Sequence, residues 1–150
     1  GRPTSLIQNY PNFEELQHME TPTQKAIKLN EELISFRKNI PPEFGCIVFT
    51  AGIDSYIKED YENNIREIIS LLKRHINYDY GLLNELYKED VKSNEYTRKH
   101  KNGDRIQSIF KLKSNQIVWI TTSGYYQHQQ NKIYDCYDYC YTTIYYPNEY

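Results

Sequence analysis

One stretch, Ile106 to Thr122 (IQSIFKLKSNQIVWITT), constrains the fold of this chain more than any other. Apolar and polar residues alternate in its first half, which is the period of a β-strand, and Ser114-Asn115 in the middle is typical of a tight turn. Both faces of the second half are fairly apolar, as in a central strand that is covered on both sides. We therefore expect a β-hairpin here, with helices from upstream packed on it.

Two segments upstream of the hairpin carry apolar residues at helical spacing. The first begins at Thr21-Pro22, a hydroxyl cap followed by proline at the first helical position, and it ends at Pro41-Pro42. The second is expected to be capped by Asp54 or Ser55. Its apolar stripe consists of Ile57, Tyr61, Ile65, Ile68, Ile69, Leu72 and Ile76. Lys73, Arg74 and His75 near its end suit the negative end of the helix dipole.

The remaining segments are shorter or less regular. Residues 45–50 are apolar and β-branched, which predicts a buried strand, and Ala51-Gly52 is expected to turn the chain out of it. A short helix is expected over 82–87, and residues 88–105 form a long polar connection, of a length that is often functional or disordered. In the tail, the tyrosines around Tyr141 alternate as in a strand, yet Cys136, Cys140 and Ile144 fit one face of a helix.

Several short motifs are shared with one group of proteins. They are Leu29-Asn30-Glu31, Phe36-Arg37, Thr50-Ala51-Gly52-Ile53, the spaced residues Asn94, His100 and Gly103, then Trp119, Tyr125-Tyr126, Thr142-Thr143-Ile144 and Glu149-Tyr150. Over residues 25–150 the chain thereby resembles an uncharacterised family, a domain of unknown function in small bacterial proteins of plasmids and other mobile elements. The resemblance implies the order helix, strand, helix, hairpin, helix. The family's signature loop is acidic, whereas this chain has Arg98, Lys99 and Lys101 there.

These observations predict an α+β fold. We expect a three-stranded, mostly antiparallel sheet with a central β-hairpin, packed by amphipathic helices in the order α-β-α-β-β-α. Residues 1–20 carry Pro3 and Pro11 and predict an N-terminal arm, with a short helical turn at 13–18. Residues 21–150 then form a single domain, since 150 residues make one domain by default.

Composition excludes several classes of function. A net charge of −2 provides no overall field that would attract nucleic acid or an anionic membrane. No run approaches the roughly 18 apolar residues of a membrane helix. Three cysteines without an apolar leader argue against a secreted disulfide framework and suggest a reduced, cytoplasmic protein. Neither a phosphate loop, a Gly-x-Ser-x-Gly elbow nor a His-Glu-x-x-His motif occurs, and no cofactor is predicted.

The basic run before the hairpin is the main candidate site. Its cationic residues are Arg98, Lys99, His100, Lys101 and Arg105. They could bind a phosphate or an acidic protein surface, and Asp104 could orient His100 as the acid–base group of an enzyme that acts on a nucleotide or a nucleic acid. A solvated loop without function explains the same run. Tyr125 and Tyr126 could stack on the bases of a single strand.

The tail offers two further candidates. Cys136 and Cys140, four residues apart, could bind zinc together with His128, but the usual Cys-x-x-Cys spacing is missing and buried thiols explain the same pattern. More than half of the chain's 16 tyrosines follow residue 124. Tyrosine is enriched in interfaces, so Tyr137 and Tyr141 could contact a protein, whereas tyrosines that simply cover the sheet are the alternative.

The sequence predicts a non-enzymatic protein-binding module. Together with the resemblance, this points to a mobile-element protein, of which an inhibitor of a host defence factor or nuclease is one form. The alternatives are an enzyme for a phosphate-bearing substrate, with His100 and Asp104, and a binder of single-stranded nucleic acid. A protein partner is expected, nucleic acid remains an option through the basic run, no membrane is involved, and the oligomeric state is open.

Overall fold

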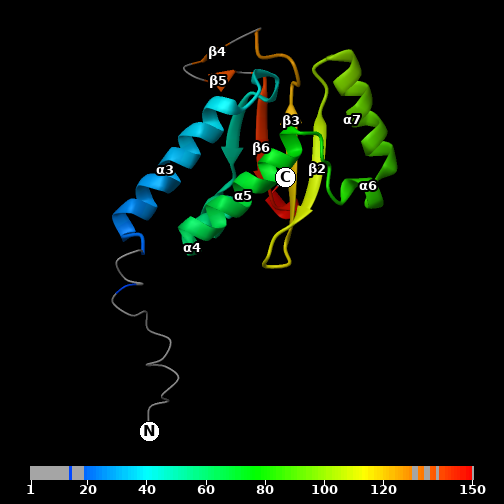
Figure 1. The fold of residues 1–150 in the computed structure, drawn as a ribbon. Coiled ribbons are helices and arrows are strands. Elements are labelled where there is room, and N and C mark those ends of the chain that lie inside the picture. The colour runs from blue at the N-terminus through cyan, green and yellow to red at the C-terminus, as the bar shows by residue number, and fades with distance from the viewer. Residues whose placement is uncertain (1–13, 15–18, 130–131, 134–135, 138, 150) are drawn as a thin grey trace. The chain divides into compact units, whose positions relative to one another are not determined.

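The computed structural model describes residue 14 and residues 19–129, 132–133, 136–137 and 139–149 (Figure 1). The chain forms two compact units, Gly1–Lys38 and Asn39–Tyr150. The predicted arm, residues 1–20, lies almost entirely outside the described residues. The predicted boundary between this arm and a single domain therefore stays a prediction.

Helix α3, Pro22–Asn39, begins where the sequence predicts. The Thr21 hydroxyl accepts a hydrogen bond from the backbone N–H of Gln24 at 3.1 Å, and the Gln24 side chain accepts one from the backbone N–H of Thr21 at 2.8 Å. This reciprocal arrangement is a capping box, which satisfies two N–H groups at the start of the helix. The helix ends two residues before Pro41, because a proline would remove a hydrogen bond and clash with the preceding turn.

The second unit contains a four-stranded sheet in the order β1-β6-β3-β2. Its strands are β1 Cys46–Phe49, β2 Ile106–Lys111, β3 Ile117–Ser123 and β6 Tyr141–Tyr145. The β2–β3 hairpin is confirmed, as is the α+β class. The sheet is mixed and has four strands where three were predicted, because the added strand β6 pairs parallel with β1 and antiparallel with β3.

Strand β6 also overturns the C-terminal helix that was expected to end the order of elements. Its residues alternate across the sheet, so that Thr142 and Ile144 are fully buried while Tyr141 is 39% exposed. The helical face proposed for Cys136 and Cys140 does not exist. Cys136–Tyr137 is strand β5 and pairs with β4, Lys132–Ile133, and the short 3-10 helix η2, Pro147–Glu149, follows β6.

The long helix predicted from Asp54 or Ser55 onward is in fact two helices, α4 Ala51–Glu59 and α5 Tyr61–Ile76. The chain breaks at Asp60, whose φ of −154° is far from the helical value. Thr50 caps α4 instead, and its hydroxyl accepts a hydrogen bond from the N–H of Ile53 at 3.4 Å. The predicted turn at residues 51–52 is thus the first turn of α4. The apolar stripe continues across the break, so periodicity alone does not reveal it.

Helices α4 and α5 pack on one face of the sheet (Figure 1). Full burial of an aliphatic side chain stabilises a fold by about 1.5–3 kcal/mol, so this layer supplies much of the stability of the second unit. The buried apolar residues of the layer are Ile53, Ile57, Ile65, Ile68, Ile69 and Leu72 from the helices and Ile106, Phe110, Val118, Ile120 and Ile144 from the strands. No helix in the described part of the chain has the length and hydropathy of a membrane span.

The polar connection predicted over residues 88–105 is mostly a helix. The short helix α6, Leu83–Leu86, confirms the prediction for 82–87, and α7, Lys88–His100, follows it beside β2 (Figure 1). The Asn94 side chain of α7 accepts a hydrogen bond from the N–H of Gln107 at 2.9 Å and donates one to its carbonyl at 2.7 Å. Helix α7 thereby blocks part of the outer edge of β2, where unpaired groups would invite another strand. Its sequence lacks an apolar stripe, which is why it was missed.

Candidate functional site

Two segments that the sequence singled out meet at one end of the second unit. They are the last turn of α7 with residues 101–105, and the loop of residues 124–128 after β3. The N–H of Tyr125 donates a hydrogen bond to the carbonyl of Asp104 at 3.3 Å. We call five residues that lie together here the basic–tyrosine cluster: Tyr78, Arg98, Lys101, Tyr125 and Tyr126.

Arg98 lies against the ring of Tyr78. The Cζ atom of Arg98 is 3.6 Å from the ring centroid, within the range of a cation–π contact. The hydroxyl groups of Tyr78 and Tyr125 are 2.7 Å apart and hydrogen-bonded. Tyr125 is only 1% exposed, and its burial, together with the Tyr78 hydroxyl and other neighbours, raises the pKa of its phenol far above the usual value. Arg98 therefore lies on the ring of Tyr78, and Tyr78 is hydrogen-bonded to Tyr125, which belongs to the core.

Lys101 makes the second contact of this kind. Its Nζ atom is 4.7 Å from the centroid of the Tyr126 ring, and that ring meets the ring of Tyr125 edge-on with centroids 4.9 Å apart. The loop that carries both tyrosines is held by Gly124, which has a φ of 65°. A Cβ atom there would lie 1.5 Å from the carbonyl oxygen of Tyr139, so only glycine fits.

The backbone of the cluster is unusual. Tyr78, Lys101 and Tyr126 have φ values of 63°, 50° and 70°, in the left-handed region that favours glycine. Among the described non-glycine residues, the other case is Asn115 in the hairpin turn, where asparagine tolerates this conformation. A residue with a Cβ atom loses about 1–2 kcal/mol in this region. Tyr78 supplies the ring of the contact with Arg98, and Lys101 and Tyr126 form the other cation–π contact.

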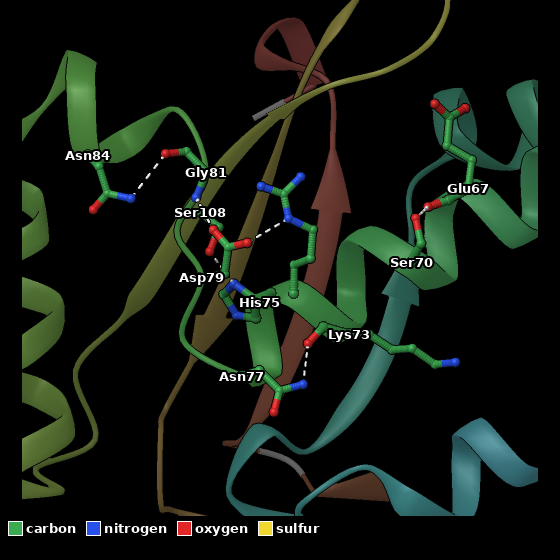
Figure 2. A network of polar contacts seen from close by, with 10 residues as sticks. Glu67, Ser70, Lys73, His75, Asn77, Asp79, Gly81, Asn84 and Ser108 are labelled. Atoms are coloured by element: carbon green, nitrogen blue, oxygen red, sulfur yellow. Dashed lines mark hydrogen bonds and ion pairs between the residues drawn. The ribbon is translucent and has the colours of Figure 1, made fainter.

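A network of polar contacts holds the turn that carries Tyr78 (Figure 2). Within it, the Nε–H of Arg74 donates to a carboxylate oxygen of Asp79 at 2.7 Å, and the N–H of Gly81 donates to the other at 3.0 Å. The hydrogen bond from Arg74 holds the pKa of Asp79 below its usual value against the opposing effect of burial. The turn is thus fixed on both sides of Tyr78, and its ring is positioned before any partner arrives.

The acid–base pair predicted from the sequence is not formed. His100 is exposed and its ring lies 4.0 Å from that of Tyr96, centroid to centroid. Within the described structure, the side chains of His100 and Asp104 make no hydrogen bond or ion pair with each other. Lys99 and Arg105 are also exposed. The carboxylate of Asp104 therefore does not orient His100 through a direct hydrogen bond.

A histidine that the sequence placed at the end of a helix is instead buried in the core. The Nδ1 atom of His75 is 2.6 Å from the hydroxyl of Ser108, and its Nε2 atom is 2.8 Å from the hydroxyl of Thr122. Thr122 in turn contacts the hydroxyl of Thr142 at 2.7 Å, and Thr142 donates to the carbonyl of Phe44 at 2.7 Å. Burial lowers the pKa of His75 to about 3, so the ring is neutral and does not stabilise the helix dipole.

This His–Ser contact has the atoms of a nucleophile and its base, but it has no access to substrate. His75, Ser108 and Thr122 are all 0% exposed. We conclude that the contact is structural and joins α5 to the middle of the sheet. One sequence signal could have found it: His75 falls on the same helical face as Ile68 and Leu72, so its side chain points toward the core.

The zinc site considered for Cys136, Cys140 and His128 includes a side chain, that of Cys136, outside the described residues. Cys140 is a buried free thiol, and burial raises its pKa to about 11, which disfavours the thiolate that binds zinc. Among the described residues, no group of three His, Cys, Asp or Glu side chains could hold a metal ion. Cys46 is disulfide-bonded, and the cytoplasmic location suggested by the cysteine count stays a prediction. The side chains of Cys136 and Tyr137 lie outside the described residues.

Of the tyrosines predicted to bind a partner, the structure brings Tyr125 and Tyr126 together with Arg98 and Lys101. Tyr141 lies apart from them on the sheet, opposite Ser123 of β3. No protein-family model, curated protein or solved structure matches the chain. The resemblance to the family of mobile-element proteins therefore stays a prediction, and the basic–tyrosine cluster is the feature from which a function can be argued.

Proposed function

We propose that the chain is a non-enzymatic protein-binding module and that the basic–tyrosine cluster is its contact surface. The observation that carries the proposal is the pair of cation–π contacts, Arg98 on Tyr78 and Lys101 on Tyr126. Tyr78, Lys101 and Tyr126 have a left-handed backbone, which for Lys101 is that of the C-cap of α7. Glycine would adopt these φ values without strain, so the chain retains side chains there at a cost of about 1–2 kcal/mol per position. Strain of this kind is concentrated at functional sites.

The chemistry of the cluster suits recognition rather than catalysis. Cation–π contacts at exposed sites contribute about 0.5–1 kcal/mol and orient a cation without neutralising it. Arg98 and Lys101 therefore keep N–H groups for a partner. Arginine and tyrosine are also among the residues that contribute most to binding energy at protein interfaces. A narrower form of the proposal, an inhibitor encoded by a bacterial mobile element, rests on the family resemblance.

Substitution of Lys101 tests the proposal, because it separates binding from stability. In Lys101→Gly, relief of about 1–2 kcal/mol of strain offsets the larger backbone entropy of glycine and the lost cation–π contact, each about 0.5–1 kcal/mol. Lys101→Asn tolerates the left-handed backbone and removes the charge together with its cation–π contact. We expect both variants to melt within a few degrees of the wild type, yet to retain less of the partner.

The partner is captured on the tagged protein from the native cell and quantified by mass spectrometry. Lys92→Asn is the matched control, because Lys92 is a 75% exposed residue of the same helix and lies outside the cluster. The proposal predicts a protein that is retained by the wild type and by Lys92→Asn but lost from both Lys101 variants. Equal retention by all four proteins, with unchanged melting temperatures, would refute it.

A further inference from the structure

We infer that the partner of the basic–tyrosine cluster is an acidic segment of another protein, an inference that rests on the proposed function. Residues 95–105 contain four basic residues (Arg98, Lys99, Lys101 and Arg105) and two acidic ones, so this segment carries +2. The chain as a whole carries −2, so the remaining residues sum to −4. The segment that carries Arg98 and Lys101 is thus locally cationic in an otherwise anionic chain.

The ring faces of the cluster are occupied by its own cations or buried in the core. Arg98 covers a face of Tyr78, Lys101 covers a face of Tyr126, and Tyr125 is 1% exposed. A binder of single-stranded nucleic acid needs open ring faces on which bases can stack, and Tyr125 has none. The role of these tyrosines is therefore to position the two cations.

The charge pattern also favours a protein partner. The carboxylate of Glu95 is 3.8 Å from the guanidinium of Arg98, and the Tyr80 hydroxyl holds Glu95 in place with a hydrogen bond of 2.6 Å. Asp104 is exposed between Lys101 and Arg105. A nucleic-acid backbone brings a negative charge with every nucleotide and prefers a strongly positive surface, so these carboxylates would repel it. A protein can instead place its own carboxylates opposite the cations alone.

The geometry also indicates how such a segment would be recognised. The guanidinium of Arg98 can donate two parallel hydrogen bonds to one carboxylate, and Lys101 offers a point charge to a second. The ligand is therefore a peptide segment that carries at least two carboxylates.

Fluorescence anisotropy with two labelled probes tests this inference on the full chain. The probes are an acidic peptide, in which glutamates are spaced by glycine and serine, and a single-stranded oligothymidylate of the same net charge. We expect the acidic peptide to bind more tightly than the oligonucleotide at physiological ionic strength. The double variant Arg98→Gln/Lys101→Asn should weaken binding of the acidic peptide by about tenfold or more, the loss expected for hot-spot residues. The control Lys88→Gln/Lys92→Asn removes two charges from the same helix and should bind as the wild type does.

Tighter binding of the oligothymidylate, lost in the double variant, would overturn the inference in favour of a nucleic-acid ligand. Equal weakening by the double variant and the control would show attraction by overall charge only and would also overturn it. The inference and the proposed function fail separately. If capture of a cellular protein depends on Lys101 but the acidic peptide does not bind, only the acidic partner is refuted. If that capture does not depend on Lys101, the proposed function fails.

Discussion

The buried imidazole of His75 makes the stability of this fold depend on pH in a calculable way. In the folded chain its pKa is lowered from 6.5 to about 3, because burial disfavours the charged form. The unfolded chain takes up a proton at this site once the pH falls below about 6.5, whereas the folded chain does so only near pH 3. The contribution of His75 to stability is therefore complete above pH 6.5 and decreases as the solution becomes more acidic.

The size of this effect follows from the two pKa values. Each pH unit between them changes the free energy of unfolding by about 1.4 kcal/mol. Acidification from pH 7 to pH 5 should thus remove about 2 kcal/mol through this group alone. Domains of this kind have total stabilities of about 5–15 kcal/mol, so the loss is large enough to measure.

Urea unfolding of the wild type and of His75→Gln at several pH values between 7 and 5 isolates this contribution. Glutamine does not titrate, and it can replace only part of the contacts with Ser108 and Thr122. We expect the variant to be less stable at pH 7 by about 1–3 kcal/mol, the cost of unsatisfied buried polar groups. Its stability should nevertheless change less with pH, so that the two curves converge by about 2 kcal/mol at pH 5.

His100→Gln is the control, because it also removes one imidazole but from an exposed position on α7. It should leave the pH dependence of the wild type in place. Parallel curves for the wild type and His75→Gln would contradict the reasoning, since they would mean that the ring gains no proton on unfolding in this range.

Two further predictions concern contacts between distant segments. The carboxylate of Glu149 accepts hydrogen bonds from the Thr50 hydroxyl at 2.7 Å and the Gly52 N–H at 2.8 Å, at the N-terminus of α4. Burial raises the pKa of Glu149, but these bonds and one from a nearby backbone N–H lower it overall. Glu149→Gln should therefore reduce the free energy of unfolding by about 0.5–1 kcal/mol at pH 7, measured by thermal unfolding. That difference should vanish as the pH falls below 4.5, the usual value for the group, and a difference that persists there would rule out a charge effect. Asn94→Ala should leave the backbone N–H and carbonyl of Gln107 without their partner. We expect it to destabilise the fold by about 1–3 kcal/mol and to speed amide exchange at Gln107. Unchanged exchange would show that another group satisfies them.

Elements whose signals are local could be read from the sequence. The hairpin follows from its period of two around Ser114-Asn115, and α3 begins at the Thr21 cap, because alternation and capping involve only neighbours along the chain. The basic residues and Tyr125-Tyr126 could likewise be chosen as candidates from their residue types. The sequence could not show which of these candidates contact one another, since this depends on where the loop after β3 passes α7.

The failures share a physical cause. Strand β6 lies between β1 and β3 because both offer it backbone partners, and these partners are about 20 to 100 residues distant in sequence. Helix α7 lacks an apolar stripe and is attached to the sheet by hydrogen bonds from one asparagine. The tail's alternation fits a strand and a helix equally well over so short a length, and only pairing decides between them.

The sequence by itself determined the α+β class, the hairpin, the start of α3 and the residue types of the candidate site, because propensity, period and charge are properties of short segments. Only the tertiary structure decided that His75 is neutral in the core and that the side chains of His100 and Asp104 are not hydrogen-bonded to each other. It alone placed Tyr78 under Arg98 and held Tyr78, Lys101 and Tyr126 in left-handed conformations. Ring contacts and hydrogen bonds between distant segments arise only when those segments meet, so the order of residues does not reveal which of them pair.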